Sequence, residues 1–292
     1  MVLQLSHHLV PAYAGRIACL LVGWLFMAAA VAQQINAGPY VPSPQSVVAD
    51  MLKIANIGAN DFVIDLGSGD GRIVLTAAKV YGASGFGVEI KDDLVESSNE
   101  AARREGVADR VKFLKQDLFK TDISQATVLT MYLLPHTVNM LSDKLQTELR
   151  PGTRVLSHDY SLAGWIPQET KTFDLEDKVK ISGVTTTIIY LYVVPARVAG
   201  RWNTTLPPAV SKQAVTIDIK QQMQKISGLA RVGGREVPIE EPKLVGEKIS
   251  FRLPLGRGRA LAFSGNVRGG SIEGNVEIGG VRAPWRASLA QK

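Results

Sequence analysis

Cysteine and histidine are scarce in this chain. Its 292 residues include one cysteine, Cys19, and four histidines. A single cysteine excludes a disulfide framework and argues against cysteine-ligated metal and cysteine catalysis. His7 and His8 precede an apolar N-terminal segment, which leaves only His136 and His158 in the body of the chain. Two histidines without cysteine partners are too few for a convincing zinc site, so we expect no metal.

Acidic residues become scarce after position 195. Residues 33–195 hold 16 Lys and Arg against 20 Asp and Glu, net −4, whereas residues 196–292 hold 16 against 7, net +9. The length exceeds the roughly 100–200 residues of a usual domain, and the hydrophobic share of 46% excludes a disordered chain. We therefore predict a leader at 1–32, a first domain at 33–195 and a basic second domain at 196–292.

Charge is missing from the segment Ile17–Ala32, which follows Arg16 and ends in the small-x-small pattern that signal peptidase accepts. The segment has 16 residues, whereas a membrane-spanning helix usually needs about 20, so a cleaved signal peptide is favoured over a membrane anchor. The next basic residue is Lys53, and the positive-inside bias therefore places Arg16 in the cytoplasm. The sequence predicts an exported, periplasmic protein, or one anchored through residues 17–32.

Apolar strands alternate with amphipathic helices between residues 43 and 194. Ser43 is expected to cap the first helix, with Pro44 at its first position. Continuous apolar strands between helices are typical of a parallel sheet covered on both faces. Residues 171–180 and 185–194 predict a closing antiparallel hairpin. The predicted strands are 62–66, 85–90, 111–115, 127–134 and 154–158, and the predicted helices that follow the first are 72–80, 92–105 and 137–149.

Short alternating segments separated by glycine turns fill residues 213–289. Alternation of apolar and polar residues predicts strands with one buried face, and Gly269-Gly270 suits a two-residue hairpin turn. We predict a small antiparallel barrel or sandwich.

A glycine-rich loop, Asp65–Arg72 (DLGSGDGR), follows the first predicted strand and opens a helix. Its backbone amides are expected to converge on the crevice where open α/β sheets bind ligands. The third glycine comes one residue too early for the dinucleotide fingerprint. In addition, Asp70 at about 4 Å from a pyrophosphate charge would cost about 4 kcal/mol at an effective dielectric of about 20. The loop therefore favours S-adenosylmethionine, a net cation, over a dinucleotide.

Two further acids lie where such a ligand would need them. Glu89 ends the second strand, where a carboxylate can accept both ribose hydroxyls. Asp117 follows the third strand and can accept from an adenine amino group. The alternative for each acid is a solvated strand end.

The region of about residues 40–194 resembles the class I S-adenosylmethionine-dependent methyltransferases. It is more closely similar to the protein-lysine methyltransferases of the mitochondrial inner membrane that act on the ATP synthase c subunit and the adenine nucleotide translocase, and to their bacterial relatives. The matching residues are Pro39–Pro42, Asp65–Arg72, Gly87–Glu89, Tyr132–Pro135 and Ser157–Asp159.

This resemblance implies a Rossmann-like, seven-stranded methyltransferase sheet ahead of the β domain. It also implies S-adenosylmethionine as cofactor and a methyl-acceptor site at Tyr132–Pro135. The exportable leader and the basic β domain depart from the family. The implied cofactor-binding residues are Asp65, Gly67, Gly69, Gly71, Glu89 and Asp117, and we add their neighbours Ser68, Asp70 and Leu118.

Methyl transfer to a lysine requires alignment and a deprotonated amine. Deprotonation at pH 7 costs about 4.6 kcal/mol from a pKa of about 10.4, so a dry slot with acceptor carbonyls, such as those of Tyr132 and Leu133, should assist. We expect Tyr40, Tyr132 and Trp165 to wall this slot; the alternative is that all three are packing residues. His158 is a candidate base or polar contact, with a structural histidine as the alternative.

The leading hypothesis is a methyltransferase that modifies a protein lysine on a membrane-associated target. The alternatives are a non-catalytic S-adenosylmethionine-binding module and a methyltransferase for a small molecule or lipid. The basic β domain is a candidate for contact with anionic membranes at about 1 kcal/mol per surface Lys or Arg. No nucleic-acid partner is expected, because the basic residues lack interleaved aromatics.

Overall fold

A computed structural model describes residues 40–179, 183–208, 210 and 214–290. The predicted leader segment, residues 17–32, lies outside the described residues. Within the described part of the chain, no helix combines the length and apolarity needed to cross a membrane.

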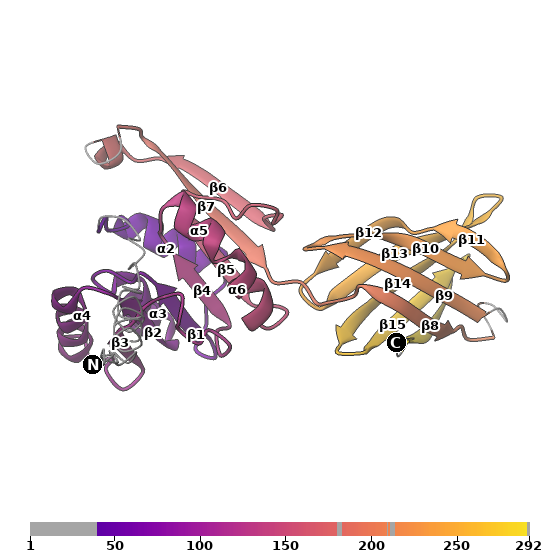
Figure 1. Cartoon of the computed structure of the whole chain (residues 1–292), viewed down its shortest axis with the longest axis horizontal. Helices are drawn as coiled ribbons and strands as arrows, with labels where there is room; N and C mark the ends of the chain where they lie inside the picture. The colour runs from indigo at the N-terminus through magenta and orange to yellow at the C-terminus, as the bar shows by residue number, and fades with distance from the viewer. Residues whose placement is uncertain (1–39, 180–182, 209, 211–213, 291–292) are drawn as a thin grey trace, which may run out of the picture. The chain divides into compact units, whose positions relative to one another are not determined.

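The first domain is built on a seven-stranded sheet with helices on its faces (Figure 1). The strand order is β3-β2-β1-β4-β5-β7-β6, and β7 runs antiparallel to both of its neighbours. This confirms the predicted α/β class and an antiparallel closing pair, but the strand predicted at 171–180 is Glu169–Asp174 and a 3₁₀ turn follows it at Glu176–Lys178. The strands are β1 Phe62–Leu66, β2 Ser84–Glu89, β3 Val111–Lys115, β4 Val128–Met131, β5 Arg154–His158, β6 Glu169–Asp174 and β7 Thr186–Val193. The helices are α2 Gln45–Ile54, α3 Arg72–Tyr81, α4 Asp92–Arg104, α5 Pro135–Met140 and α6 Ser142–Glu148, with a 3₁₀ turn, η1, at Glu176–Lys178.

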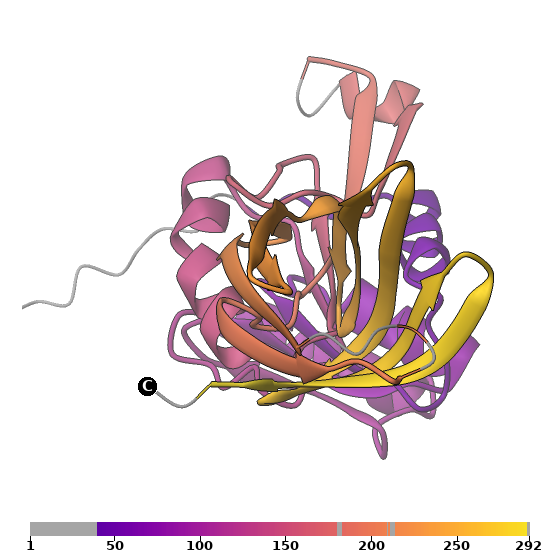
Figure 2. The ribbon, with the colours of Figure 1, turned by 90° about the vertical axis from the view of Figure 1, so that its right-hand side faces the viewer.

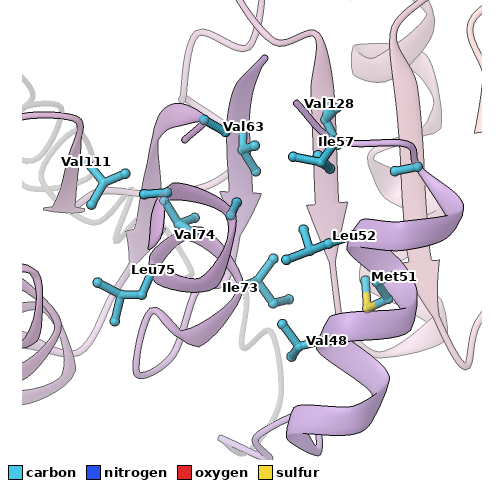
Figure 3. Packing of buried hydrophobic residues seen from close by; sticks show 14 of the residues in the cluster. Val48, Met51, Leu52, Ile57, Val63, Ile73, Val74, Leu75, Val111 and Val128 are labelled. Atoms are coloured by element: carbon cyan, nitrogen blue, oxygen red, sulfur yellow. The ribbon is translucent and has the colours of Figure 1, made fainter. Parts of the chain in front are cut away.

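Aliphatic side chains hold α2 and α3 against the sheet (Figure 3). Val48, Met51 and Leu52 recur at helical spacing on α2 and are fully buried. They pack in one cluster with Ile73 of α3 and Val63 of β1. Each such side chain contributes about 1.5–3 kcal/mol on burial, so this cluster fixes α2 and also α3, the helix that follows the glycine loop, against the sheet.

The start of α2 corrects one prediction. The helix has Pro44 as its N-cap residue, and no side chain caps it. Ser43 is buried, and its Oγ lies 2.9 Å from Nδ1 of His158. The hydroxyl that we expected to cap the helix is therefore used by a partner 115 residues away. The predicted helix 137–149 is two helices, α5 and α6, separated at Leu141.

The second domain is one antiparallel sheet of nine strands in the order β11-β10-β9-β8-β16-β15-β14-β13-β12. Its two edge strands, β11 and β12, are consecutive and joined only by Ile239. One segment, 235–245, therefore pairs first with β10 and then with β13, and the sheet rolls into a barrel (Figure 2). The strands are β8 Gly200–Thr205, β9 Ala214–Gln222, β10 Lys225–Val232, β11 Arg235–Pro238, β12 Glu240–Val245, β13 Lys248–Gly256, β14 Arg259–Arg268, β15 Ser271–Ile278 and β16 Val281–Leu289.

Alternate residues of these strands fill the barrel with their own core. Phe251 and Phe263 stack with ring centroids 4.9 Å apart, and Trp285 meets the ring of Phe263 edge-on at 4.8 Å. On the outer wall, cross-strand ion pairs such as that of Arg201 with Asp218 link neighbouring strands. The barrel is thus a packed domain whose basic surface is partly neutralised. The predicted boundary at 195/196 falls between β7 and β8.

Candidate functional site

The candidate site lies at the carboxyl ends of β1, β2, β4 and β5. The strand order reverses between β1 and β4, and open α/β sheets bind ligands in the crevice at such a switch point. The glycine loop leaves β1 at this edge, and the segment Tyr132–Leu134 leaves β4 beside it.

The loop needs glycine for both conformation and space. Gly67, Gly69 and Gly71 have φ of 78°, 53° and 77°, a left-handed region that side chains disfavour. A Cβ on Gly67 would lie 2.7 Å from Leu133, and one on Gly69 would lie 2.5 Å from the ring of Tyr40. Two predicted acceptor-site residues, Leu133 and Tyr40, therefore lie directly against the predicted cofactor loop.

The loop amides do not converge on the crevice as expected. Those of Gly67 and Ser68 both donate to the carbonyl of Val88 at 2.9 Å, and that of Gly71 donates to the carbonyl of Ser68. The amide of Gly69 donates to Oε2 of Glu89 at 3.1 Å. Because these donors are used inside the protein, the loop lacks the array of free amides that a pyrophosphate needs.

From the sequence we treated Asp70 as an unpaired carboxylate that would repel a phosphate, but in the structure it is paired. It forms an ion pair with Arg72, whose Nη2 lies 2.5 Å from Oδ2. Although burial acts to raise it, the pKa of Asp70 is held below its usual value by the hydrogen bonds and charge of Arg72. The shortage of free loop amides, rather than the charge of Asp70, therefore argues against a dinucleotide. Burial and the charge of Asp70 raise the pKa of Tyr40.

Asp65 is almost fully buried at the end of β1. Thr130 donates to its Oδ1 at 2.7 Å. Burial raises the pKa of Asp65 to about 7; the bond from Thr130 opposes this rise, and the negative charges of Asp70 and Glu89 add to it. A buried acid that is half protonated near neutral pH is a typical feature of a functional site.

Glu89 and Asp117 lie at the ends of neighbouring strands. Oε1 of Glu89 accepts from the amide of Ile90 at 2.7 Å, and Oε2 accepts from the loop, so the carboxylate is fixed in place. Oδ1 of Asp117 accepts from the amide of Phe119 at 2.9 Å, and the Asp117 side chain is 41% exposed. The side chain of Leu118 is buried in the core, which leaves its backbone for any ligand contact.

On the acceptor side, the ring of Tyr132 packs against that of His158, with centroids 3.9 Å apart and planes tilted by 33°. The Tyr132 hydroxyl donates to Oδ2 of Asp159 at 3.2 Å. Burial raises the pKa of Tyr132 well above its usual value, and the charge of Asp159 adds to this rise. Burial also lowers the pKa of His158 to about 4, so both rings are neutral near pH 7.

Two site residues were not predicted from the sequence. Asp159 appeared only as part of a matching motif, and Lys178 on η1 was not singled out. Nζ of Lys178 lies 2.7 Å from Oδ1 of Asp159, which is 19 residues earlier in the chain. No local signal identifies this pairing, because a charged side chain beside a turn normally indicates a solvated position.

Trp165 does not wall the slot. It is 6% exposed, its Nε1 donates to Ser142 at 3.0 Å, and its ring meets Tyr192 edge-on in the core. The alternative that we kept for Trp165, a packing residue, is the one that this geometry supports.

The crevice suits a cationic cofactor. It gathers the carboxyl groups of Asp65, Glu89 and Asp117, whereas the arginine that follows the loop is already paired with Asp70. S-adenosylmethionine carries cationic groups and hydroxyl and amino donors, which carboxylates bind well. The residues present therefore fit this cofactor.

Comparison with known proteins finds similarity in the first domain. Residues 65–169 match a family model described as the ANTKMT methyltransferase domain. A protein-lysine N-methyltransferase of Saccharolobus islandicus is 44% identical over 53% of this chain and 93% of that protein. A lysine N-methyltransferase of the ATP synthase c subunit, from Xenopus laevis, is 37% identical over 44% of this chain, which spans just over half, 56%, of that relative.

A solved structure is also similar. It is an RNA methyltransferase from Salinibacter ruber in complex with S-adenosyl-L-homocysteine, 44% identical, covering 54% of this chain and 96% of that one with a TM-score of 0.48.

Proposed function

This chain belongs to the S-adenosylmethionine-dependent protein-lysine N-methyltransferases, and from that premise we propose that its target is a lysine on a membrane-associated protein. One observation supports this activity most directly. The glycine loop has acidic side chains beside it and lies against the Tyr132 segment. The relatives named for the ATP synthase c subunit support a membrane-associated target.

The cofactor residues act as anchors. Glu89 would bind the ribose hydroxyls and Asp117 the adenine amino group, and Asp65, about half ionised at pH 7, would add negative charge near the loop. When bound, S-adenosylmethionine supplies a methyl group on a sulfonium, which is already activated for displacement. The protein therefore needs no covalent nucleophile, and alignment is its main contribution.

The acceptor residues hold the lysine amine. Tyr132 and Leu133 present carbonyls and one aromatic wall, and Tyr40 lies against Gly69 on the loop side. His158 is neutral and buried, so it supports the ring of Tyr132 without adding a charge. Formation of the neutral amine at pH 7 costs about 4.6 kcal/mol in water, so exclusion of water from the slot would assist it.

A labelling experiment tests this function. The purified protein is incubated with methyl-labelled S-adenosylmethionine and fractionated membranes, beside Glu89→Ala and, as a matched control, Asp143→Ala at the start of α6. We expect label on lysine in one protein band, lost with Glu89→Ala and retained with the control. Label only in the lipid extract supports the lipid methyltransferase. Cofactor binding without transfer supports the non-catalytic module. Either result would contradict the proposal.

We further propose that residues 17–32 direct the body across a membrane. The support is the uncharged run behind Arg16 and its small-x-small end. Amino-terminal sequencing should find a mature chain beginning near Gln33, or an uncleaved chain whose body is digested by protease added outside the cytoplasmic membrane. A body protected from that protease would contradict this localisation.

For the β domain we propose contact with anionic membranes through one end of the barrel. The β13–β14 and β15–β16 turns lie at the same end, because the strands alternate in direction. They carry Arg257, Arg259 and Arg282, all exposed, beside Val281, which is 46% exposed. Across the described residues, none of these arginines forms an ion pair with an acid. Each is worth about 1 kcal/mol at an anionic surface.

Vesicle binding tests this contact. Arg257→Glu with Arg259→Glu should weaken binding to phosphatidylserine vesicles by more than about tenfold at low salt, since two attractive charges become repulsive. Lys220→Glu with Lys225→Glu, which flank the turn at the opposite end, change the net charge equally and should have a smaller effect. Equal losses for the two pairs would show that only net charge matters.

A further inference from the structure

A buried polar cluster lies behind the acceptor segment. It consists of Tyr132, His158, Asp159 and Lys178, and we call it the Asp159 cluster. Oδ2 of Asp159 accepts from the Tyr132 hydroxyl at 3.2 Å and lies 3.6 Å from Nε2 of His158. Oδ1 accepts from Nζ of Lys178 at 2.7 Å. One carboxylate therefore connects the other three side chains.

The backbone of Asp159 is held in an uncommon conformation. Its φ is 64°, in the left-handed region that costs most residues about 1 kcal/mol. Its amide donates to the carbonyl of Ile188 at 2.7 Å, and its Oδ1 accepts from the amide of Ile188 at 3.1 Å. Strain of this kind persists where the surroundings over-determine it, and it gathers at functional sites.

The Asp159 carboxylate and the Lys178 ammonium form a buried ion pair. The Lys178 side chain is 9% exposed and that of Asp159 is 11% exposed, so their attraction is poorly screened. Lys178 also donates to the carbonyl of Thr186 on β7. Among the contacts that the structure describes, the titratable groups beside Asp159 include Tyr132 and His158, both neutral near pH 7.

An ionised carboxylate can only accept a hydrogen bond. The hydrogen of the Tyr132 hydroxyl therefore points to Asp159, and the phenolic oxygen turns only lone pairs towards any other partner. We propose that Asp159, paired with Lys178, is a positioning residue for the methyl acceptor. Through Tyr132 it creates a hydrogen-bond acceptor for an N–H of the substrate lysine. This inference rests on the proposed acceptor site at Tyr132.

The chemistry matches the requirement of the reaction. A neutral amine has N–H donors and one lone pair. An N–H held by the Tyr132 oxygen fixes the nitrogen, and its lone pair stays available to form the new N–C bond while the S–C bond of the cofactor breaks. If Tyr132 were free to turn its hydrogen towards the amine, it would instead bind that lone pair. Asp159 thus selects the productive orientation.

A double-mutant cycle tests the inference. Tyr132→Phe, Asp159→Asn and the double variant are compared for methyl transfer to the solubilised membrane fraction, with cofactor affinity measured by calorimetry. Tyr190→Phe on β7 is the matched control. We expect each single variant to lower the apparent kcat by about 10- to 100-fold with cofactor affinity within about twofold. The double variant should be no slower than Tyr132→Phe, because Asp159 acts through Tyr132.

A second variant separates positioning from folding. Lys178→Met leaves Asp159 buried without its cation, and its carboxyl should protonate more readily. Protonated Asp159 gains an O–H donor and no longer fixes the direction of the Tyr132 hydrogen, so activity of Lys178→Met should fall as the pH falls from about 9 to about 6 more steeply than that of the unmodified protein. Lys178→Arg should restore the original profile.

The outcomes distinguish the two proposals. If the unmodified protein methylates no lysine, the proposed function fails. If it is active but the losses of the two single variants multiply in the double variant, or the Lys178→Met profile is unchanged, the positioning role of Asp159 is wrong while the function stands.

Discussion

At the scale of single residues, glycine sets the conformation of the loop, and burial and ion pairing set the charge of the acids around it. The φ values of Gly67, Gly69 and Gly71 follow from a sequence pattern that only glycine satisfies. The neutralisation of Asp70 depends on the rotamer of Arg72, and the raised pKa of Asp65 depends on burial by the whole sheet. Neither property is local, so neither could be inferred from spacing.

Asp65 gives a prediction at this scale. With a pKa of about 7, its carboxyl is about half protonated at pH 7. A cationic cofactor stabilises the ionised form, so binding should release up to about half a proton. Calorimetry at pH 7 in phosphate and in Tris measures this release as a difference in binding enthalpy. Asp65→Asn should abolish the difference. Equal enthalpies for the unmodified protein in both buffers would show that the charge of Asp65 is insensitive to the cofactor.

At the scale of elements, strand positions followed closely from apolar runs, because each central strand of the sheet is buried on both faces. The predictions for 62–66 and 154–158 match β1 and β5 to the residue, whereas the predicted strand 127–134 extends past Met131, the end of β4. The predicted cap of α2 was wrong, because the Ser43 side chain hydrogen-bonds to His158 instead of to the helix backbone. Contacts between residues 115 positions apart leave no periodicity in the sequence.

The Ser43 contact is testable by unfolding. Ser43→Ala leaves Nδ1 of His158 buried without its partner, which should lower the free energy of unfolding by about 1–3 kcal/mol. Ser46→Ala, exposed on the first turn of α2, should change it by less than about 0.5 kcal/mol. Urea denaturation followed by the helix signal measures both. A loss for Ser43→Ala no larger than that for Ser46→Ala would mean that the contact adds nothing to stability.

At the scale of the whole molecule, two buried groups give opposite pH dependences. His158 has a folded pKa of about 4 against 6.5 unfolded, so the unfolded state binds more protons and stability rises with pH between these values. Asp65 has a folded pKa of about 7 against 3.8 unfolded, so the folded state binds more protons and stability falls with pH. Between about pH 4 and 6.5 the two slopes should nearly cancel.

Single variants should separate the two contributions to the pH dependence of the free energy of unfolding. Across about pH 4–6.5, Asp65→Asn should leave a stability that rises by up to about 1.4 kcal/mol per pH unit, and His158→Asn one that falls by a similar amount. Urea unfolding at several pH values, followed by the helix signal of the first domain, measures both slopes. Slopes of the same sign in the two variants would contradict the opposing contributions.

The closure of the barrel by the single segment 235–245 has a consequence for how the second domain meets other molecules. Because β11 pairs with β10 and the adjoining β12 pairs with β13, the ladder of backbone hydrogen bonds runs around a ring. Among the strands that the structure describes, both ends of the sheet are thus held in one short segment instead of facing a foreign strand. This arrangement leaves little open sheet edge for a foreign strand, so the turns and the outer wall are the main surfaces for partners, and aggregation through strand addition is disfavoured.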